Sequence, residues 1–340
     1  DVSADGSTRV VRTDTYGAYV WDMTEWRQVV TSTGLPAGEV GVERNAGVYE
    51  IRVAPSHPGR LYMSYRGYVY RSDDQGHTWT RTAFAQVEMD PNDSYRTLGE
   101  KLAVDPANPD VLYVGTPRNG LFVSQDGGAS FTPAAGVPAG LQASNGWPGI
   151  TGIVIDPNSR RTGGRSRLVY ASSYGNGVWR SRDGGATWAR LSGGPASVGH
   201  AVIGPDGTLF ATAGDGSSVW RFARGAWTEI TPPAGQYWHA VMADPFDANR
   251  VVVATDGGYL TQSYDRGATW AEIIWSVSRT ASDIPWLAWT NESYMSNGDM
   301  RFDPTVPDQL WFAQGIGVWT ASVSPGASAV TWSSRSAGIE

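Results

Sequence analysis

The sequence contains no cysteine, only one lysine and no long uninterrupted run of apolar residues. The absence of cysteine excludes disulfide bonds, thiolate metal sites and a cysteine nucleophile. Because no apolar run reaches about 18 residues, we expect no membrane-spanning helix and no membrane partner. Acidic side chains outnumber basic ones, 33 to 26, for a formal charge of -7. We therefore expect no nucleic-acid partner, since binding a phosphate backbone needs a basic surface.

What the sequence does contain is repetition, which indicates the architecture before any local pattern does. Four segments share the pattern Ser-x-Asp-x-Gly-x-(Thr or Ser)-(Trp or Phe), and they begin at Ser72, Ser124, Ser181 and Ser263. A second pattern, an apolar run that ends in Asp-Pro or a related pair, occurs seven times. Its first four copies begin at residues 2, 53, 104 and 155, each 51 residues apart.

Each repeat is expected to form four short strands separated by Pro, Gly, Asp and Asn, with almost no helical periodicity. Repeats of about 40 to 50 residues with four strands each are typical of propeller blades. We therefore predict an all-β fold, a seven-bladed β-propeller with four-stranded blades over residues 1–335. The blades are expected near residues 1–30, 47–84, 96–135, 149–192, 198–231, 238–276 and 297–335. Residues 336–340 are expected to begin a following propeller.

The Ser-x-Asp-x-Gly segments are expected at the turn between the third and fourth strands of a blade. Asp would accept backbone N–H bonds, Gly would take a positive φ, and the aromatic residue would pack between blades. A calcium loop is the alternative, but the bidentate Glu and the alternating oxygen ligands of such a loop are missing. The four histidines show no metal-binding spacing either. We expect neither a metal nor a cofactor.

The loops after the second strands and between the repeats vary in length, and they should share one face of the propeller. Variable loops on a rigid scaffold are where function is expected. This face is rich in aromatic side chains, whose flat amphipathic rings suit the faces of sugars. Packing between blades would account for half or more of these rings. The candidate sugar-binding residues are Tyr16, Tyr19, Trp147, Trp238, Trp286 and Trp289.

Carboxylates accompany the rings on the variable-loop face. Glycoside hydrolysis generally needs two carboxyl groups, one acting as an acid and one as a base or nucleophile. Spacing alone favours a structural role for each of them, because Asp commonly ties loops together. The carboxylates in these loops are Asp14, Asp215, Asp256, Asp283, Glu292 and Asp299, with Glu50 and Glu100 near the channel-side ends of first strands.

Several stretches resemble, in chain order, the N-terminal propeller of glycoside hydrolase family 74, the xyloglucanases. They include RTDTYGAYVWD, PWLAWTNESYMSNGDMRFDP and the final SAGIE, and the resemblance covers nearly the whole chain. It implies secretion, a polysaccharide substrate, and two seven-bladed propellers with the glucan chain in the cleft between them. The Asp of RTDxxGAY is the family's general base, which corresponds to Asp14. The family's general acid lies in a GDxGGF-type motif of the second propeller, which this sequence lacks.

The resemblance leads us to expect an inverting endo-β-1,4-glucanase of the xyloglucanase type, completed by a second propeller of the same polypeptide. If the chain acts alone, the acid must come from Asp256, Asp299 or Glu292. Arg12, on the same side of the strand as Asp14, is expected to help keep the Asp14 carboxylate ionised. Two alternatives stay open, namely a non-catalytic propeller that binds glycan or protein, and a glycosidase acting on another polysaccharide.

Overall fold

The computed structural model describes residues 1–41, 47–233, 235–278, 297–315 and 317–339. Every regular element in these residues is a β-strand, and none of them forms a helix. The predicted all-β fold is therefore confirmed. It follows that the described part of the chain offers no helix long and apolar enough to cross a membrane.

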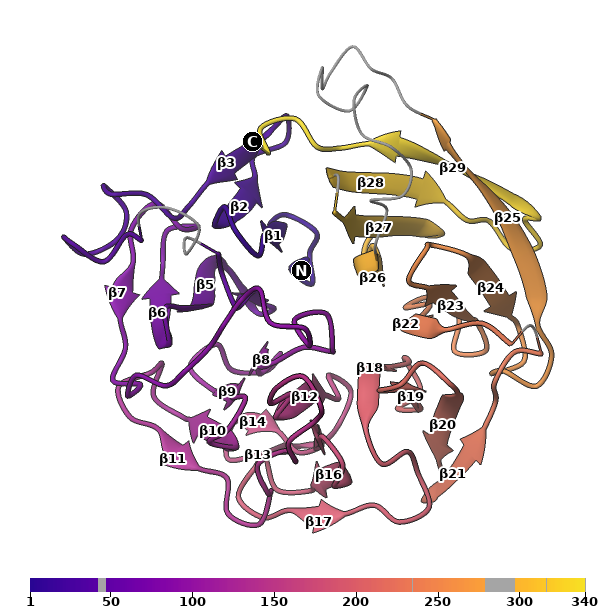
Figure 1. The fold of residues 1–340 in the computed structure, drawn as a ribbon, viewed down its shortest axis with the longest axis horizontal. Helices are drawn as coiled ribbons and strands as arrows, with labels where there is room; N and C mark the ends of the chain where they lie inside the picture. Colours follow the sequence, from indigo (N-terminus) through magenta and orange to yellow (C-terminus); the bar gives the residue numbers. More distant parts are fainter. Residues whose placement is uncertain (42–46, 234, 279–296, 316, 340) are drawn as a thin grey trace.

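The strands form antiparallel sheets that follow one another around a ring (Figure 1). The first sheet has three strands: β1 (Val10–Arg12), β2 (Ala18–Trp21) and β3 (Trp26–Gln28). The second contains β4 (Glu50–Ala54), β5 (His57–Tyr65), β6 (Tyr68–Ser72) and β7 (Thr80–Arg81). The third contains β8 (Leu102–Val104), β9 (Leu112–Gly115), β10 (Leu121–Ser124) and β11 (Thr132–Pro133).

Two further four-stranded sheets and one small hairpin continue the ring. The fourth sheet contains β12 (Ile150–Ile155), β15 (Val169–Ser173), β16 (Gly177–Ser181) and β17 (Ala189–Arg190). The hairpin of β13 (Arg161–Thr162) and β14 (Arg165–Ser166) lies between its first two strands in sequence. The fifth sheet contains β18 (Val198–Ile203), β19 (Leu209–Ala213), β20 (Val219–Ala223) and β21 (Ala226–Glu229).

The last part of the ring is one eight-stranded sheet. Its strands are β22 (Trp238–Ala243), β23 (Val251–Thr255), β24 (Leu260–Ser263), β25 (Ala271–Ser278), β26 (Asn297–Phe302), β27 (Gln309–Gln314), β28 (Gly317–Ser322) and β29 (Ala329–Ser334). Their order in the sheet is β22-β23-β24-β25-β29-β28-β27-β26. A parallel pairing of β25 with β29 joins two antiparallel groups of four strands.

The first strand of each sheet lies innermost, next to the first strand of the following sheet. Contacts run in this way from β1 through β4, β8, β12, β18 and β22 to β26. Apolar clusters fill the space between successive sheets, so many strands are buried on both faces. The four residues Leu112–Gly115, for example, are all buried. The ring of innermost strands therefore gathers the loops beside it around one centre.

The Ser-x-Asp-x-Gly segments occupy the predicted turns between third and fourth strands. After β6, the Ser72 hydroxyl donates to Asp74, and the Asp74 carboxylate accepts from the backbone N–H and the hydroxyl of Thr78. Gly76 has a φ of 78°, and the Trp79 indole donates to the Val29 carbonyl of the preceding part of the ring. The bonds of the Ser and Asp side chains recur after β10, β16 and β24, whereas an indole bond to the preceding sheet recurs only at Trp270. These segments are therefore structural turns.

The first sheet differs from the prediction of four strands per blade. Beside β3, the Trp26 backbone N–H donates to the Ala337 carbonyl over 2.7 Å, and the Trp26 indole N–H donates to the Arg335 carbonyl. Ile339 packs against the apolar cluster of this sheet. The end of the described chain thus takes the place next to β3. That residues 336–340 begin another propeller stays a prediction.

Candidate active site

A cavity of about 840 Å³ lies where the first and last parts of the ring meet. Its lining comes mainly from β1, β4, β26 and β27 and from the loops beside them. The cavity brings together Asp14 and Asp299 of the predicted catalytic residues, the aromatic residue Tyr16, and the channel-side residues Glu50 and Glu100.

Asp14 lies at this cavity in the tight loop between β1 and β2. The Thr13 N–H donates to the Gly17 carbonyl over 2.8 Å, and the Tyr16 N–H donates to the Thr13 hydroxyl. Gly17 has a φ of 91°, a conformation that glycine adopts without steric cost. The backbone of Gly47 packs so closely against the Asp14 carbonyl that a side chain at position 47 would collide with it. The side chain of Asp14 is nevertheless 40% exposed and can meet a ligand.

Arg96, rather than Arg12, pairs with the Asp14 carboxylate. The Arg96 Nε lies 3.2 Å from Asp14 Oδ2, and the Thr15 hydroxyl donates to Asp14 Oδ1. The Arg12 guanidinium instead lies 3.7 Å from Glu50 and donates to main-chain carbonyls. The expectation for Arg12 was therefore wrong, because a residue of a distant loop approaches Asp14 more closely than its neighbour along the strand.

Glu50 and Glu100 belong to a network of ion pairs in the cavity wall. Arg52 lies 3.2 Å from Glu50 and 3.8 Å from Glu100, and Arg301 also pairs with Glu100. Burial alone would raise the pKa of Glu50, but the charges of Arg52, Arg12 and Lys101 outweigh it and lower the pKa. Glu50 therefore stays ionised, and a general acid must instead hold a proton.

Asp299, in β26, is a poor general acid for the same reason. Its Oδ1 lies 3.3 Å from His200 Nε2, and its Oδ2 lies 2.9 Å from Arg301 Nε. Burial tends to raise the pKa of Asp299, but the nearby His200 and the charge of Arg52 lower it. An acid catalyst needs the opposite shift. The environment of Asp299 therefore disfavours the acid role that the sequence suggested.

The remaining acid candidates lie away from the cavity or outside the described residues. Asp256 is exposed in the turn after β23 and does not line the cavity. Glu292 and Asp283 lie outside the described residues, as do Trp286 and Trp289. A group of three or more His, Asp or Glu side chains suited to a metal ion is also absent from the described part of the chain.

Two of the predicted sugar-binding rings are core residues. Trp238 is 1% exposed and packs in the cluster between the fifth and last sheets. Tyr19 is 3% exposed and packs against Trp26. Both predictions were wrong, because these residues lie in strands covered on both faces rather than in the adjoining loops. Tyr16, in contrast, is 65% exposed beside Asp14 and is free to stack on a ligand.

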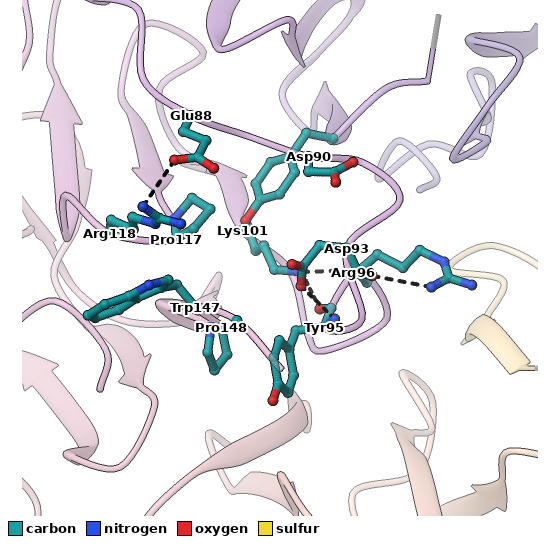
Figure 2. Close-up of a pocket in the computed structure, with 12 residues that line it drawn as sticks. Glu88, Asp90, Asp93, Tyr95, Arg96, Lys101, Pro117, Arg118, Trp147 and Pro148 are labelled. Carbon is teal, nitrogen blue, oxygen red and sulfur yellow. Dashed lines mark hydrogen bonds and ion pairs between the residues drawn. The ribbon is translucent and has the colours of Figure 1, made fainter. Parts of the chain in front are cut away.

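Trp147 lies on the rim of a second, smaller cavity of about 60 Å³. Figure 2 shows the Arg118 side chain between Trp147 and Glu88. The Arg118 guanidinium is 5.5 Å from the centre of the Trp147 ring and 3.3 Å from the Glu88 carboxylate. The Arg118 cation thus lies over one face of the half-buried Trp147 ring.

Lys101, the single lysine of the sequence, lies beneath the smaller cavity and is 2% exposed. Its ammonium donates to the main-chain carbonyls of Tyr95 and Arg96, at 3.2 and 3.4 Å. Burial, assisted by the charge of Arg12, lowers the pKa of Lys101 to about 7. Sequence reasoning did not identify Arg96 or Lys101 as site residues. The signals available were the uniqueness of Lys101 and the polar segment DPNDSYR that precedes it.

Known proteins with a similar sequence and fold are GH74 xyloglucanases and related enzymes. No protein-family model matches the chain. It is 26% identical to the xyloglucanase Xgh74A of Acetivibrio thermocellus over 91% of this chain and 44% of that protein. The solved GH74 xyloglucanase of Xanthomonas campestris is 26% identical, with a TM-score of 0.83 over 100% of this chain and 54% of the other. The GH74 enzyme of Niastella koreensis is 28% identical, with a TM-score of 0.79 over 98% of this chain and 53% of the other.

The chain therefore spans about half the length of the relatives it matches. Similarity in sequence and in structure extends over nearly all of this chain. The resemblance of this chain to the propellers of glycoside hydrolase family 74 is thus confirmed.

Proposed function

We propose that this chain is the base-carrying part of a secreted, inverting endo-β-1,4-glucanase of the xyloglucanase type. The position of Asp14 carries the proposal. Its carboxylate lies at the large cavity, 40% exposed, with Arg96 on one oxygen and Thr15 on the other. A carboxylate that is held in place yet open to ligand is what a general base requires. The similarity to named xyloglucanases supports xyloglucan as the substrate.

In the proposed reaction, Asp14 accepts a proton from a water molecule as that water attacks the anomeric carbon of the bound glucan. A second carboxyl group donates a proton to the leaving oxygen, and inverting enzymes keep the two groups roughly 6.5 to 9.5 Å apart. Asp299 is ionised, and Asp256 does not line the cavity. We therefore infer that the acid comes from a second propeller of the same polypeptide. That the chain spans about half of its relatives supports this inference.

We also infer that the sheets correspond to the seven blades predicted near residues 1–30, 47–84, 96–135, 149–192, 198–231, 238–276 and 297–335. On this assignment the eight-stranded sheet counts as two blades, β22–β25 and β26–β29, joined by the β25–β29 pairing. The continuous series of innermost strands supports it.

Tyr16 and Trp147 are the proposed sugar platforms among the described residues. Tyr16 is exposed beside Asp14, and Trp147 lines the smaller cavity on the loop between the third and fourth sheets. An aromatic ring binds a sugar through the apolar C–H face of the pyranose. A role for Trp286 and Trp289 stays a prediction.

The test is hydrolysis of a panel of polysaccharides by the full-length protein that the gene encodes. Release of reducing ends from xyloglucan is expected, and inversion can be followed by NMR of the newly formed anomer. Asp256→Asn is a matched control for Asp14→Asn, because Asp256 occupies the corresponding loop of another sheet and does not line the cavity. Retained turnover in Asp256→Asn would also eliminate Asp256 as the acid.

A second candidate function is glycan binding without catalysis. It is favoured by the surroundings of two carboxylates that line the cavity: the buried Glu50 and the partly exposed Asp299 are both paired with cations, and both have lowered pKa values. A protein that binds xyloglucan through Tyr16 and Trp147 yet releases no reducing ends from any polysaccharide of the panel would support this candidate and overturn hydrolysis.

A further inference from the structure

Arg96 reaches Asp14 from the end of the long segment between the second and third sheets. Its Nε lies 3.2 Å from Asp14 Oδ2, and its Nη1 donates to the Asp93 carbonyl over 3.2 Å. The Arg96 backbone N–H also donates to the Asp93 carbonyl. The guanidinium is therefore held on its own loop while it presents one edge to Asp14. Asp14 and Arg96 belong to different repeats, so this arrangement depends on how the two repeats pack.

The main chain of Arg96 accepts hydrogen bonds from two side chains of the protein interior. The Arg96 carbonyl accepts a hydrogen bond from Arg12 Nη2 at 2.8 Å and one from Lys101 Nζ at 3.4 Å. Hydrogen bonds from charged donors are stronger than those between neutral groups. Arg12 and Lys101 are in turn linked to Glu50, which lies 3.7 Å from Arg12 and accepts the Lys101 backbone N–H. The Arg96 backbone is thus attached to the wall of the large cavity.

Burial distinguishes this arrangement from an ordinary surface ion pair. Arg96 and Asp14 are 38% and 40% exposed, and exposed pairs contribute little to folding. Lys101 and Glu50, however, are only 2% and 3% exposed. Burying a charge such as that of Glu50 is costly, and Glu50 and Lys101 lie under an ion pair that is itself open to solvent. Lys101 and Glu50 thus support Arg96 and Asp14, the two side chains that a ligand can reach.

We propose that Arg96 is a positioning residue, which orients the Asp14 carboxylate toward the cavity, and that Arg12 and Lys101 hold the Arg96 backbone for this task. This inference rests on the proposed function of Asp14 as the general base. Arg96 pairs with one carboxylate oxygen, and the other accepts a hydrogen bond from the Thr15 hydroxyl. Because the Asp14 side chain is 40% exposed, water and substrate can still reach it. A misplaced catalytic group lowers turnover without removing the binding surface.

The test compares Arg96→Gln, Arg96→Lys, Asp14→Asn and the double variant Asp14→Asn/Arg96→Gln in the full-length protein on xyloglucan. Arg96→Gln is expected to lower kcat about 10- to 100-fold with KM changed by no more than about twofold. Arg96→Lys, which keeps the charge, should recover part of this loss. In the double variant, loss of Arg96 should cost nothing beyond the Asp14→Asn loss, because residues that act as a unit are not additive.

Arg81→Gln is the matched control. Arg81 is 47% exposed, lies 3.2 Å from Glu39 and is not among the residues that line the large cavity, so removing it should leave kcat unchanged. Wild-type kcat in Arg96→Gln, or an equal loss from Arg96→Gln with and without Asp14, would overturn the proposal. If Asp14→Asn itself retains wild-type turnover, the proposed function fails instead.

A crystal structure of the Arg96→Gln variant tests the positioning without relying on turnover. The expected result is an Asp14 carboxylate that has turned from its wild-type rotamer while the β1–β2 loop stays in place. An unchanged carboxylate in that variant would refute a positioning role for Arg96, whatever the protein's activity.

Discussion

Arg9 and Asp303 form an ion pair that joins the two ends of the ring. Arg9 Nη2 lies 3.0 Å from Asp303 Oδ2, and the two side chains are 14% and 0% exposed. The Trp311 indole N–H donates to the same oxygen over 2.9 Å, and the Arg9 guanidinium lies 4.9 Å from the Trp311 ring centre. Residues that are 294 apart in the chain are thereby held together.

Replacing Arg9 should therefore destabilise the ring as a whole. Arg9→Met leaves the buried Asp303 charge without its cation, and breaking such a pair costs about 3 to 5 kcal/mol of unfolding free energy. Arg81→Gln, which removes an exposed pair, should cost less than about 1 kcal/mol. Urea denaturation followed by tryptophan fluorescence measures both. Equal losses in the two variants would show that the Arg9 pair does not fasten the ring.

Lys101 should give the protein an unusual dependence of stability on alkaline pH. Its pKa is about 7 in the folded protein against 10.5 as the ordinary value, mainly because the side chain is buried. Between these values the unfolded chain binds more protons than the folded one, so this group makes stability rise with pH. The slope is at most about 1.4 kcal/mol per pH unit.

Lys101→Met isolates this contribution because it keeps the bulk of the side chain and removes the titrating group. The difference in unfolding free energy between wild type and variant should change across pH 7 to 10.5, with the wild type gaining relative to Lys101→Met as pH rises. Urea titrations at several pH values measure it. A difference that is constant across this range would contradict the lowered pKa.

Tyr16 and Trp238 should respond in opposite ways to replacement. Trp238→Ala opens a cavity in the core and should cost about 3 to 5 kcal/mol of stability. Tyr16→Ala removes a ring that is 65% exposed, so stability should change by less than about 0.5 kcal/mol while xyloglucan binding weakens by about 1 to 3 kcal/mol. Thermal unfolding and isothermal titration calorimetry separate the two effects. Unchanged affinity in Tyr16→Ala would remove Tyr16 from the proposed binding surface.

The features predictable from the sequence are those that depend on neighbours in the chain. The turn at Ser72 and Asp74 needs only residues within a few positions, so the backbone N–H bond that Asp74 accepts could be predicted from the sequence. The exposure of Asp14 and Tyr16 likewise follows from a short loop between two strands.

The relationships that were missed connect residues far apart in the chain. Arg96 meets Asp14 across 82 positions, and Trp238 is buried because a neighbouring sheet covers the strand that carries it. The hydrophobic pattern of a sequence does not show whether an aromatic residue next to a loop is exposed in that loop or buried as the first residue of a strand that is covered on both faces. The supporting partner of Asp14 and the burial of Trp238 therefore required the three-dimensional structure.

The most direct test of the account is the turnover of xyloglucan by Asp14→Asn in the full-length protein. The substitution keeps the size of the side chain and removes the charge that a general base needs. The account predicts a protein that unfolds at the wild-type temperature and still binds xyloglucan, but releases reducing ends several orders of magnitude more slowly. Hydrolysis by Asp14→Asn at a rate near that of the Asp256→Asn control would contradict it.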